Sequence, residues 1–380
     1  MVHPASDIPN QPVATTAGKI GYVPNANGNV VDTMGDQQYT GYTGTISNFI
    51  TPITPGGEVT LWPSNFKRDG YGFVGWSDKY DWVLNENDAN GNGTGINDGY
   101  HIYGPNQTIT APADINTKGL TLYAVWTKSA GNIQNWSCPN NTIMPVGAVT
   151  ALTDTRDNNT YAVAKLADNN CWIIENLRLG GSQQINLTTT DSALSINLTL
   201  PASIDAFATS FYTNIEMNAT NTLSPATNIT TTPDNNTAVY SYGNYYSWPA
   251  SIGTTTAYNT HGTNVTTSIC PKGWSLPLGN SVTTTNKSFS YLDVQLGGTG
   301  VSQTTTFISN RWRTYPTNFI YAGCFGDSST INRGSFAYFW SSTVYSSQDT
   351  YGVILGNSRL DPGSTNLGKY FGRTIRCIAN

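Results

Sequence analysis

The amino-acid sequence predicts an α+β fold in which β-structure dominates. Only 11% of the 380 residues are charged, against roughly 25% in an average globular domain. The 22 Tyr, 12 Phe and 10 Trp can each bury a large area, which allows a compact core with few aliphatic side chains. Much of the remainder is Asn, Thr, Ser and Gly, a composition typical of short strands joined by many turns.

The length indicates two or three domains. Residues 1–16 are polar and contain Pro, so we expect a flexible leader. The following region, 17–128, contains strand patterns at 19–23, 59–62, 71–74 and 120–126. In the last of these, alternation places one set of side chains on one face (Leu120, Leu122, Ala124, Trp126) and the other set opposite (Thr121, Tyr123, Val125).

Three segments of this region, 19–28, 66–76 and 120–127, resemble the internalin-type B-repeat, also called the Listeria–Bacteroides repeat. The resemblance includes the Gly-Tyr-x-Phe-x-Gly-Trp and Leu-Tyr-Ala-x-Trp signatures. It implies a small β-grasp-like module of a bacterial surface protein. An insertion rich in Asp, Asn and Gly interrupts it at 77–104.

The insertion contains a segment, 88–94, that fits the opening of an EF-hand loop. Position twelve of that loop is Gly99, where calcium binding requires a bidentate Glu. We therefore expect a solvated turn over 88–99 with weak or no calcium binding, and we expect neither a metal site nor a cofactor in the chain.

Residues 129–135 are polar and include a Gly, which is typical of a linker, and a second domain then spans 136–380. It is expected to contain a hairpin with its turn at 157–159 and long surface excursions over 181–235. Phe289, Leu292 and Leu296 share a face of a helix that is capped near Asn286 and ended by Gly297-Gly298. Late strands are expected around 339–343, 352–355 and 373–377.

Five motifs follow one another in this second domain: Asp-x-Arg-Asp…Tyr at 154–161, Cys-Trp-x-x-Glu-Asn-Leu at 171–177, Gly-Trp-x-Leu-Pro at 273–277, Trp-Ser-Ser-Thr at 340–343 and Arg-Cys at 376–377. Together they resemble the Fibrobacter succinogenes major paralogous domain. The resemblance implies a C-type-lectin-like fold in an exported binding or display scaffold, with no established enzyme activity. Trp172, Trp274 and Trp340 would then lie in the scaffold core. The triplets of calcium-dependent sugar-binding lectins (Glu-Pro-Asn, Gln-Pro-Asp, Trp-Asn-Asp) do not occur, so calcium-dependent sugar binding is not implied.

Five well-spaced cysteines in a loop-rich chain favour disulfides and an oxidising compartment. We favour the pairs Cys138–Cys171 and Cys270–Cys377, which tie the start of the domain to its hairpin and its end to its middle. Four cysteines allow three pairings, and the sequence does not select among them. Cys324 would be left over as a small buried hydrophobic residue. No signal peptide is visible, so we interpret the chain as a mature region of a longer exported protein.

Charge and hydropathy exclude some partners. A net charge of −5 without a basic stripe argues against a nucleic-acid partner. No apolar run is long enough to cross a bilayer, so no membrane span is expected. The histidines (His3, His101, His261) lie in no metal or nucleophile motif.

The C-terminal stretch 345–371 is rich in Tyr, Ser, Gly and Asn, a composition typical of antibody paratopes. We expect loops here to bind an extracellular protein or glycan ligand. The stretch also resembles the region that diversity-generating retroelements vary in some C-type-lectin-like proteins; the alternative is ordinary loop composition. The candidate ligand-binding residues are Tyr345, Asp349, Tyr351, Asn357, Arg359, Asn366, Lys369 and Tyr370.

The sequence therefore favours a non-enzymatic, adhesin-like protein of the bacterial cell surface, in which the first module is a spacer or docking unit. One alternative is a structural stalk or display protein without a ligand of its own. Another is a polysaccharide-cleaving enzyme that uses Asp154, Asp157 and Glu175, since glycosidases need a carboxylate pair. For Glu175 we favour a buried contact with Arg156 or with the backbone.

Overall fold

The computed structural model confirms that the chain is rich in β-structure with a few short helices. It describes residues 20–23, 30–31, 53, 55–64, 67–78, 83–84, 101–179, 184–201, 219–220, 242–254, 257–280, 284–304, 306–326 and 329–380. The expected leader at 1–16, the calcium-loop candidate at 88–99 and most of the expected excursion at 181–235 lie outside the described residues.

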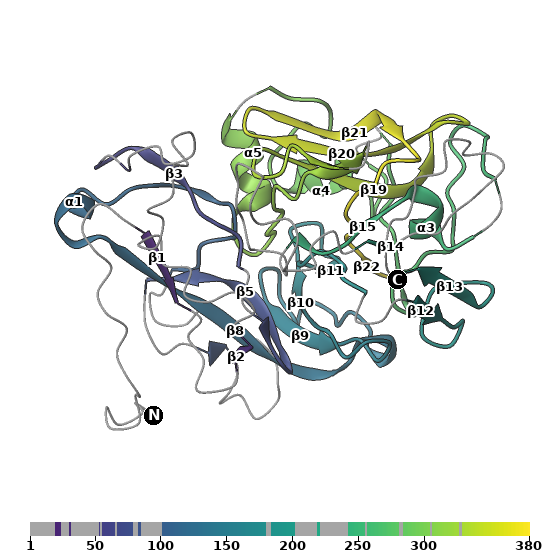
Figure 1. The fold of residues 1–380 in the computed structure, drawn as a ribbon, viewed down its shortest axis with the longest axis horizontal. Coiled ribbons are helices and arrows are strands. Elements are labelled where there is room, and N and C mark those ends of the chain that lie inside the picture. Colours follow the sequence, from purple (N-terminus) through teal and green to yellow (C-terminus); the bar gives the residue numbers. More distant parts are fainter. Residues whose placement is uncertain are drawn as a thin grey trace.

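A nine-stranded sheet joins the two halves of the sequence (Figure 1). Its N-terminal part consists of β1 (Ile20–Val23), β5 (Tyr71–Ser77) and β6 (Val83–Leu84), all of which pair with the long strand β8 (Leu120–Asn132). From β8 the sheet continues through β9 (Val149–Thr153), β10 (Thr160–Lys165), β11 (Cys171–Ile173), β22 (Ile378–Ala379) and β16 (Trp274–Ser275).

Strand β8 continues past residue 128, where the first module was expected to end. Ser129 pairs with Ala151 and Asn132 pairs with Thr153, and a 3₁₀ helix (Ile133–Asn135) follows directly. Residues 129–135 are therefore part of the folded body and do not form the linker that the sequence indicated. Their side chains are mostly exposed while their backbone extends the sheet, so their polarity resembles that of a linker.

The alternation predicted for β8 is confirmed. Leu122, Ala124 and Trp126 lie in a core cluster of the N-terminal module, by which we mean the described residues between 17 and 128. Val125 points to the opposite face and packs into a second cluster. That second cluster also contains side chains of the C-terminal domain, by which we mean residues 136–380. The two parts of the chain therefore share a hydrophobic core.

Close backbone contacts reinforce this junction. A Cβ on Gly72 would lie 2.5 Å from the backbone nitrogen of Ala162, so glycine is required where β5 crosses β10. The side chain of Asn318 donates to the carbonyl of Val74 at 2.6 Å. The N-terminal module is thus packed tightly against the C-terminal domain.

A three-stranded antiparallel sheet lies at the top of Figure 1 in yellow. It consists of β19 (Phe336–Val344), β20 (Asp349–Gly356) and β21 (Arg359–Gly368). The strands expected around 339–343 and 352–355 are thus confirmed, and the remainder of the stretch 345–371, expected as loops, is also largely strand. The strand expected around 373–377 is wrong, because residues 373 and 374 form only isolated bridges and β22 begins at Ile378. Strand β21 was not expected because its Asp-Pro-Gly sequence at 361–363 favours a turn, and the strand accommodates it through register shifts against β20.

The helices are short, and one confirms a prediction. Helix α4 (Phe289–Gln295) lies where the apolar spacing placed it, but its cap is Ser288, whose side chain accepts from the Tyr291 backbone N–H, and not Asn286. Other α-helices in the described part of the chain are α1 (Ile115–Lys118), α3 (Trp248–Ile252) and α5 (Thr306–Arg313).

Five two-stranded sheets complete the described fold. They pair β2 (Val30–Val31) with β4 (Lys67–Arg68), β3 (Glu58–Thr60) with β7 (Thr108–Thr110), β12 (Gln184–Leu187) with β13 (Leu198–Pro201), β14 (Ala219–Thr220) with β15 (Tyr245–Tyr246), and β17 (Cys324–Gly326) with β18 (Ser329–Ile331).

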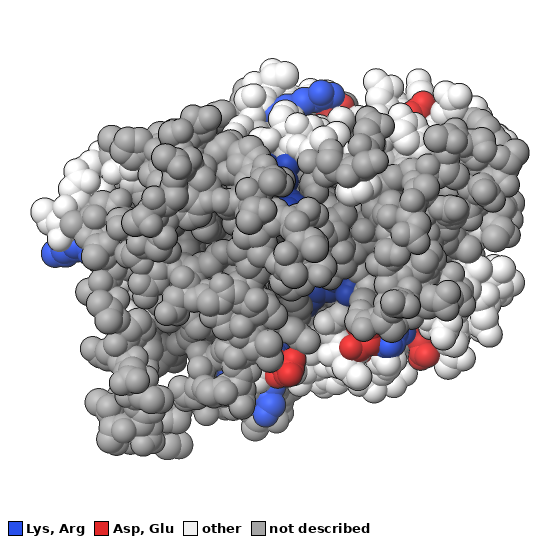
Figure 2. Space-filling view, viewed as in Figure 1, with Lys and Arg blue, Asp and Glu red and all other residues white. Residues whose placement is uncertain are grey.

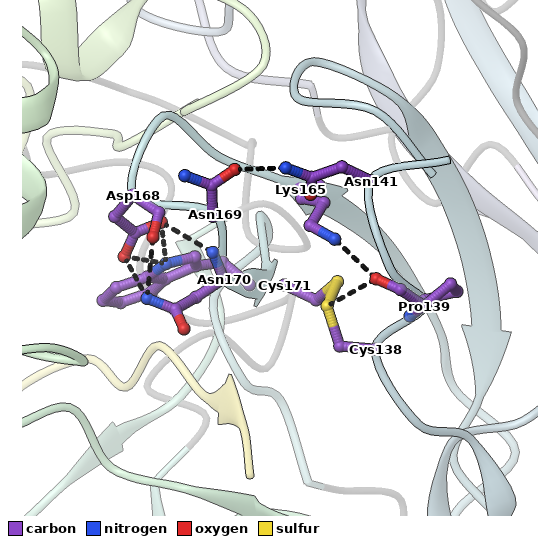
Figure 3. Close-up of a disulfide and its surroundings, with 9 residues drawn as sticks. Cys138, Pro139, Asn141, Lys165, Asp168, Asn169, Asn170 and Cys171 are labelled. Carbon is purple, nitrogen blue, oxygen red and sulfur yellow. Dashed lines mark hydrogen bonds between the residues drawn. A yellow bond between two sulfur atoms is a disulfide. The ribbon is translucent and has the colours of Figure 1, made fainter. Parts of the chain in front are cut away.

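Both favoured disulfides, Cys138–Cys171 and Cys270–Cys377, are present, and Cys324 is free and buried. Figure 3 shows the first bridge beside Lys165, whose ammonium donates to the Pro139 carbonyl. The expected core residues Trp172, Trp274 and Trp340 are at most 1% exposed. The predicted hairpin is present as β9–β10; residues 154–159 connect its strands, so the turn begins before the predicted 157–159, and Asn158 lies in the left-handed region.

Candidate binding surface

Strands β20 and β21 divide the candidate ligand residues into two groups. Tyr345, Asp349, Tyr351, Asn366 and Tyr370 lie toward the end of the sheet where Asp349 pairs with Gly368. Asn357 and Arg359 lie at the hairpin turn, at the other end of both strands. Eight residues of β20 separate the ends, which corresponds to roughly 20 Å at the usual rise of a strand. The eight candidates therefore do not form one surface.

The first end carries three aromatic rings in mutual contact: Tyr345, Tyr351 and His261, which we call the aromatic cluster. Their ring centroids lie 5.3 Å (Tyr345–Tyr351), 5.5 Å (His261–Tyr345) and 6.0 Å (His261–Tyr351) apart, with steeply tilted planes. The hydroxyl of Tyr351 lies 3.2 Å from Nε2 of His261. His261 is exposed and both tyrosines are half-buried, so the cluster is open to solvent yet ordered by its own contacts.

Backbone pairing places His261 beside the tyrosines. The N–H of Gly262 donates to the carbonyl of Val344 at 2.9 Å, and the N–H of Val344 donates to the carbonyl of Thr263 at 2.9 Å. Tyr345 follows directly on Val344 and begins the tight turn into β20, in which its N–H donates to the carbonyl of Asp349 at 3.1 Å. His261 was missed as a binding candidate because the sequence showed it only outside metal and catalytic motifs.

Partial burial raises the pKa of the Tyr351 phenol, and the nearby Tyr345 raises it further. The Tyr351 hydroxyl therefore stays protonated at neutral pH and can donate as well as accept a hydrogen bond. Together the cluster offers apolar ring surface with polar atoms at its edge. This combination suits recognition of a ligand that has both apolar and hydroxyl or amide groups.

The structure contradicts a ligand-contacting role for Lys369. Its relative exposure is 0%, and its ammonium donates to three backbone carbonyls inside the domain. A sequence interpretation expects lysine at the surface because a buried charge is costly unless it is fully hydrogen-bonded. Here the carbonyls supply that bonding.

The second group, Asn357 and Arg359 at the hairpin turn, is exposed and polar. Arg359 is exposed, and its guanidinium lies 3.4 Å from the carboxylate of Asp361 two residues away on the same strand. Asn357 is exposed in the two-residue turn before it. On β19 beside this end, Phe336 pairs with Gly356 and stacks on Tyr338, with 6.2 Å between the two ring centroids.

The carboxylates of the hydrolase alternative are engaged in structural contacts. Asp154 is held by the guanidinium of Arg156, with the closest pair of atoms 2.6 Å apart. Glu175 accepts from the Ala162 backbone N–H at 2.6 Å and pairs with Arg178 at 3.1 Å. The expected backbone contact of Glu175 is thus confirmed, but its arginine partner is Arg178 and not Arg156, which Asp154 occupies.

Asp157 is the third of these carboxylates. It accepts from the backbone N–H and the side-chain amide of Asn159, at 2.9 and 2.7 Å, and closes the turn between β9 and β10. Burial, and then the charge of Asp154, raises its pKa to about 6. The sequence could not show this because the shift depends on how closely the turn folds.

Charged side chains are scattered over the face of the molecule in Figure 2 and form no continuous patch among the residues coloured there. In the described ranges, no group of three or more His, Cys, Asp or Glu side chains is placed to hold a metal ion. None of the described helices has the length and hydropathy of a membrane span. Comparisons with protein-family models, with curated proteins and with solved structures found no match.

Proposed function

We propose that the chain is a non-enzymatic binding protein of the bacterial cell surface, which recognises an extracellular protein or glycan ligand through the aromatic cluster. The observation that carries this proposal is the contact of three rings, Tyr345, Tyr351 and His261, at a solvent-facing end of a rigid sheet. Clustered tyrosines give a large contact area at a low cost in conformational entropy, which is why binding surfaces are enriched in them.

Two further observations support this proposal. Both disulfides suit an oxidising, extracellular environment. Asp154 and Glu175 are bound by arginines within the fold, which favours a binding role over polysaccharide cleavage.

The resemblance to a C-type-lectin-like display domain agrees with this proposal. If residues 345–371 vary between gene copies, exposed positions such as Asn357 and Asn366 can change without altering the core. Lys369 cannot change in this way, because its side chain is buried inside the domain. Variation that spares position 369 would therefore be expected of a diversified binding domain.

The test uses the whole chain, because the two parts share one core. The wild type, a Tyr345→Ala/Tyr351→Ala variant and a matched Asn357→Ala/Arg359→Ala variant are each applied to an array of immobilised glycans and to intact epithelial and bacterial cells. We expect the first variant to lose binding at least roughly tenfold while its melting temperature stays close to that of the wild type. The second variant should bind as the wild type does.

Equal binding by all three proteins would contradict the aromatic cluster as the binding surface. Loss of binding only in the Asn357/Arg359 variant would move the site to the other end of the sheet. Absence of binding by the wild type on both arrays and cells would favour a structural display protein without its own ligand.

A further inference from the structure

The ammonium of Lys369 connects two segments that are distant in sequence. It donates to the carbonyl of Tyr258 at 2.7 Å and to the carbonyls of Ser346 and Ser347 at 2.8 and 3.2 Å. Three acceptors match the three N–H donors of an ammonium group. The backbone N–H of Lys369 also donates to the carbonyl of Gln348 at 3.0 Å.

Both of these segments carry rings of the aromatic cluster. Tyr258 lies three residues before His261, and Ser346 directly follows Tyr345. The turn that contains Ser346 and Ser347 also determines where Tyr345 stands relative to Tyr351, since it leads from β19 into β20. A side chain that holds these carbonyls in place therefore holds the cluster in place.

The burial of this ammonium is costly, so the contacts that it makes must be favourable. Burial lowers the pKa of Lys369 to about 8, although the nearby Asp349 acts in the opposite direction. The ammonium lies over the ring of Trp248, with Nζ 4.8 Å from the ring centroid. An apolar residue of similar length would fill the same space over Trp248 without the desolvation cost.

We propose that Lys369 is a positioning residue for the ligand surface: its ammonium holds the 258–262 and 345–349 segments together, so that Tyr345, Tyr351 and His261 are arranged for binding before the ligand arrives. This inference rests on the function proposed above. Pre-organisation of this kind strengthens binding because fewer groups must be ordered when the complex forms.

The structure offers a matched control for this role. Lys165 is also buried, at 3% exposed, and its ammonium also donates to a backbone carbonyl, that of Pro139 (Figure 3). It lies beside the Cys138–Cys171 disulfide in the strand β10, which is not part of the three-stranded sheet. Lys165→Met likewise removes a buried ammonium that donates to a backbone carbonyl, but in a different part of the domain.

The first experiment needs no ligand. Hydrogen exchange is followed at the backbone amides of Tyr345, Ser346 and Gly262 in the full chain. We expect Lys369→Met to reduce protection there at least roughly tenfold, because charge-assisted hydrogen bonds are lost, while amides of β10 are unchanged. Lys165→Met should not affect these three amides. Lys369→Arg keeps the charge and should restore part of the protection. Unchanged protection in Lys369→Met would overturn the inference.

The second experiment is a double-mutant cycle. It measures binding to the array glycan or the cell type that the wild type binds most tightly. If Lys369 acts by placing the rings of the cluster, Lys369→Met weakens binding in the wild type and in Arg359→Ala, but has a clearly smaller effect in Tyr345→Ala. Equal losses in all three backgrounds would show that Lys369 acts only through overall stability. If the wild type binds nothing, the proposed function fails, and hydrogen exchange alone decides whether Lys369 orders the two segments.

Discussion

The side-chain amide of Asn310 and the backbone of Thr108 exchange two hydrogen bonds across the junction between the C-terminal domain and the N-terminal module. The Thr108 N–H donates to Oδ1 of Asn310 at 2.8 Å, and Nδ2 of Asn310 donates back to the Thr108 carbonyl at 3.0 Å. Nearby, the Tyr321 N–H donates to the side chain of Asn106 at 2.8 Å. With strand β8 common to both parts, these contacts make the described body a single structural unit.

We therefore predict that the chain unfolds in one cooperative transition. Asn310→Ala should lower the free energy of unfolding by about 1–2 kcal/mol, since it leaves two backbone groups without their partner. Asn141→Ala, which removes an exposed hydrogen bond to the side chain of Asn169, is the control and should change it by less than about 0.5 kcal/mol. Denaturant titration followed by Trp fluorescence measures both values.

Truncation provides a stronger test of the same point. A chain that begins at residue 136 lacks β8 and the side chains of Val74, Ile102 and Val125 that complete the shared core. It should aggregate or lack a cooperative transition. A truncated chain that unfolds cooperatively with nearly the stability of the full chain would contradict the shared core.

The two disulfides should differ in their contribution to stability. In the chain-entropy model, Cys138–Cys171, with a separation of 33 residues, contributes about 4 kcal/mol, and Cys270–Cys377, with a separation of 107, about 5 kcal/mol. Paired Cys→Ala variants of each bridge should therefore both be destabilised, the second by about 1 kcal/mol more. Equal stability of the wild type in the presence and absence of reductant would contradict this expectation.

Cys324 should be chemically protected while the protein is folded. Its thiol is buried, and burial raises its pKa, so little of the reactive thiolate forms near neutral pH. Without reductant, a thiol reagent should react with no cysteine of the folded chain and with one per chain after denaturation. Three or more reactive thiols in denaturant would mean that the disulfides had not formed.

Asp157 makes stability depend on pH in a defined direction. Its folded pKa of about 6 exceeds the ordinary value of 3.8, so the folded state binds its proton more tightly than the unfolded state does. Stability contributed by this group is present below pH 3.8 and is lost as the pH rises to about 6. Relative to the wild type, Asp157→Asn should therefore gain stability, on the order of 1–2 kcal/mol, between pH 4 and pH 7. A stability difference that is constant over this range would show that Asp157 has no raised pKa.

The parts of the fold that follow from local pattern could be predicted from the sequence. Alternation along β8 identified both faces correctly, and the spacing of Phe289 and Leu292 located helix α4. The favoured disulfide pairs are also present. The predictions for β8 and α4 rest on periodicity, whereas the disulfide pairs were a favoured choice among three pairings that the sequence allows.

The parts that depend on tertiary contacts could not be predicted. The polar residues after Lys128 resembled a linker because only backbone pairing with β9 makes them a strand. Strand β21 carries Pro362 and Gly363, which weaken any local signal for a strand. Lys369 was assigned to the ligand surface because nothing in its local sequence indicates that three carbonyls converge on it. His261 joins the site only through its pairing with β19.

An NMR titration that follows the histidine ring resonances of the full chain as ligand is added tests binding at the aromatic cluster most directly. His261 packs edge-on against Tyr345 and Tyr351, while His101 packs in the same way against Tyr103 in the N-terminal module, 4.4 Å between ring centroids, and is the internal control. The ligand is the array glycan or isolated cell-surface protein that the wild type binds best. Binding at the aromatic cluster predicts that the His261 signals shift with the ligand concentration while those of His101 stay in place. A titration that shifts His101 alone, or that saturates with neither ring affected, would contradict the account.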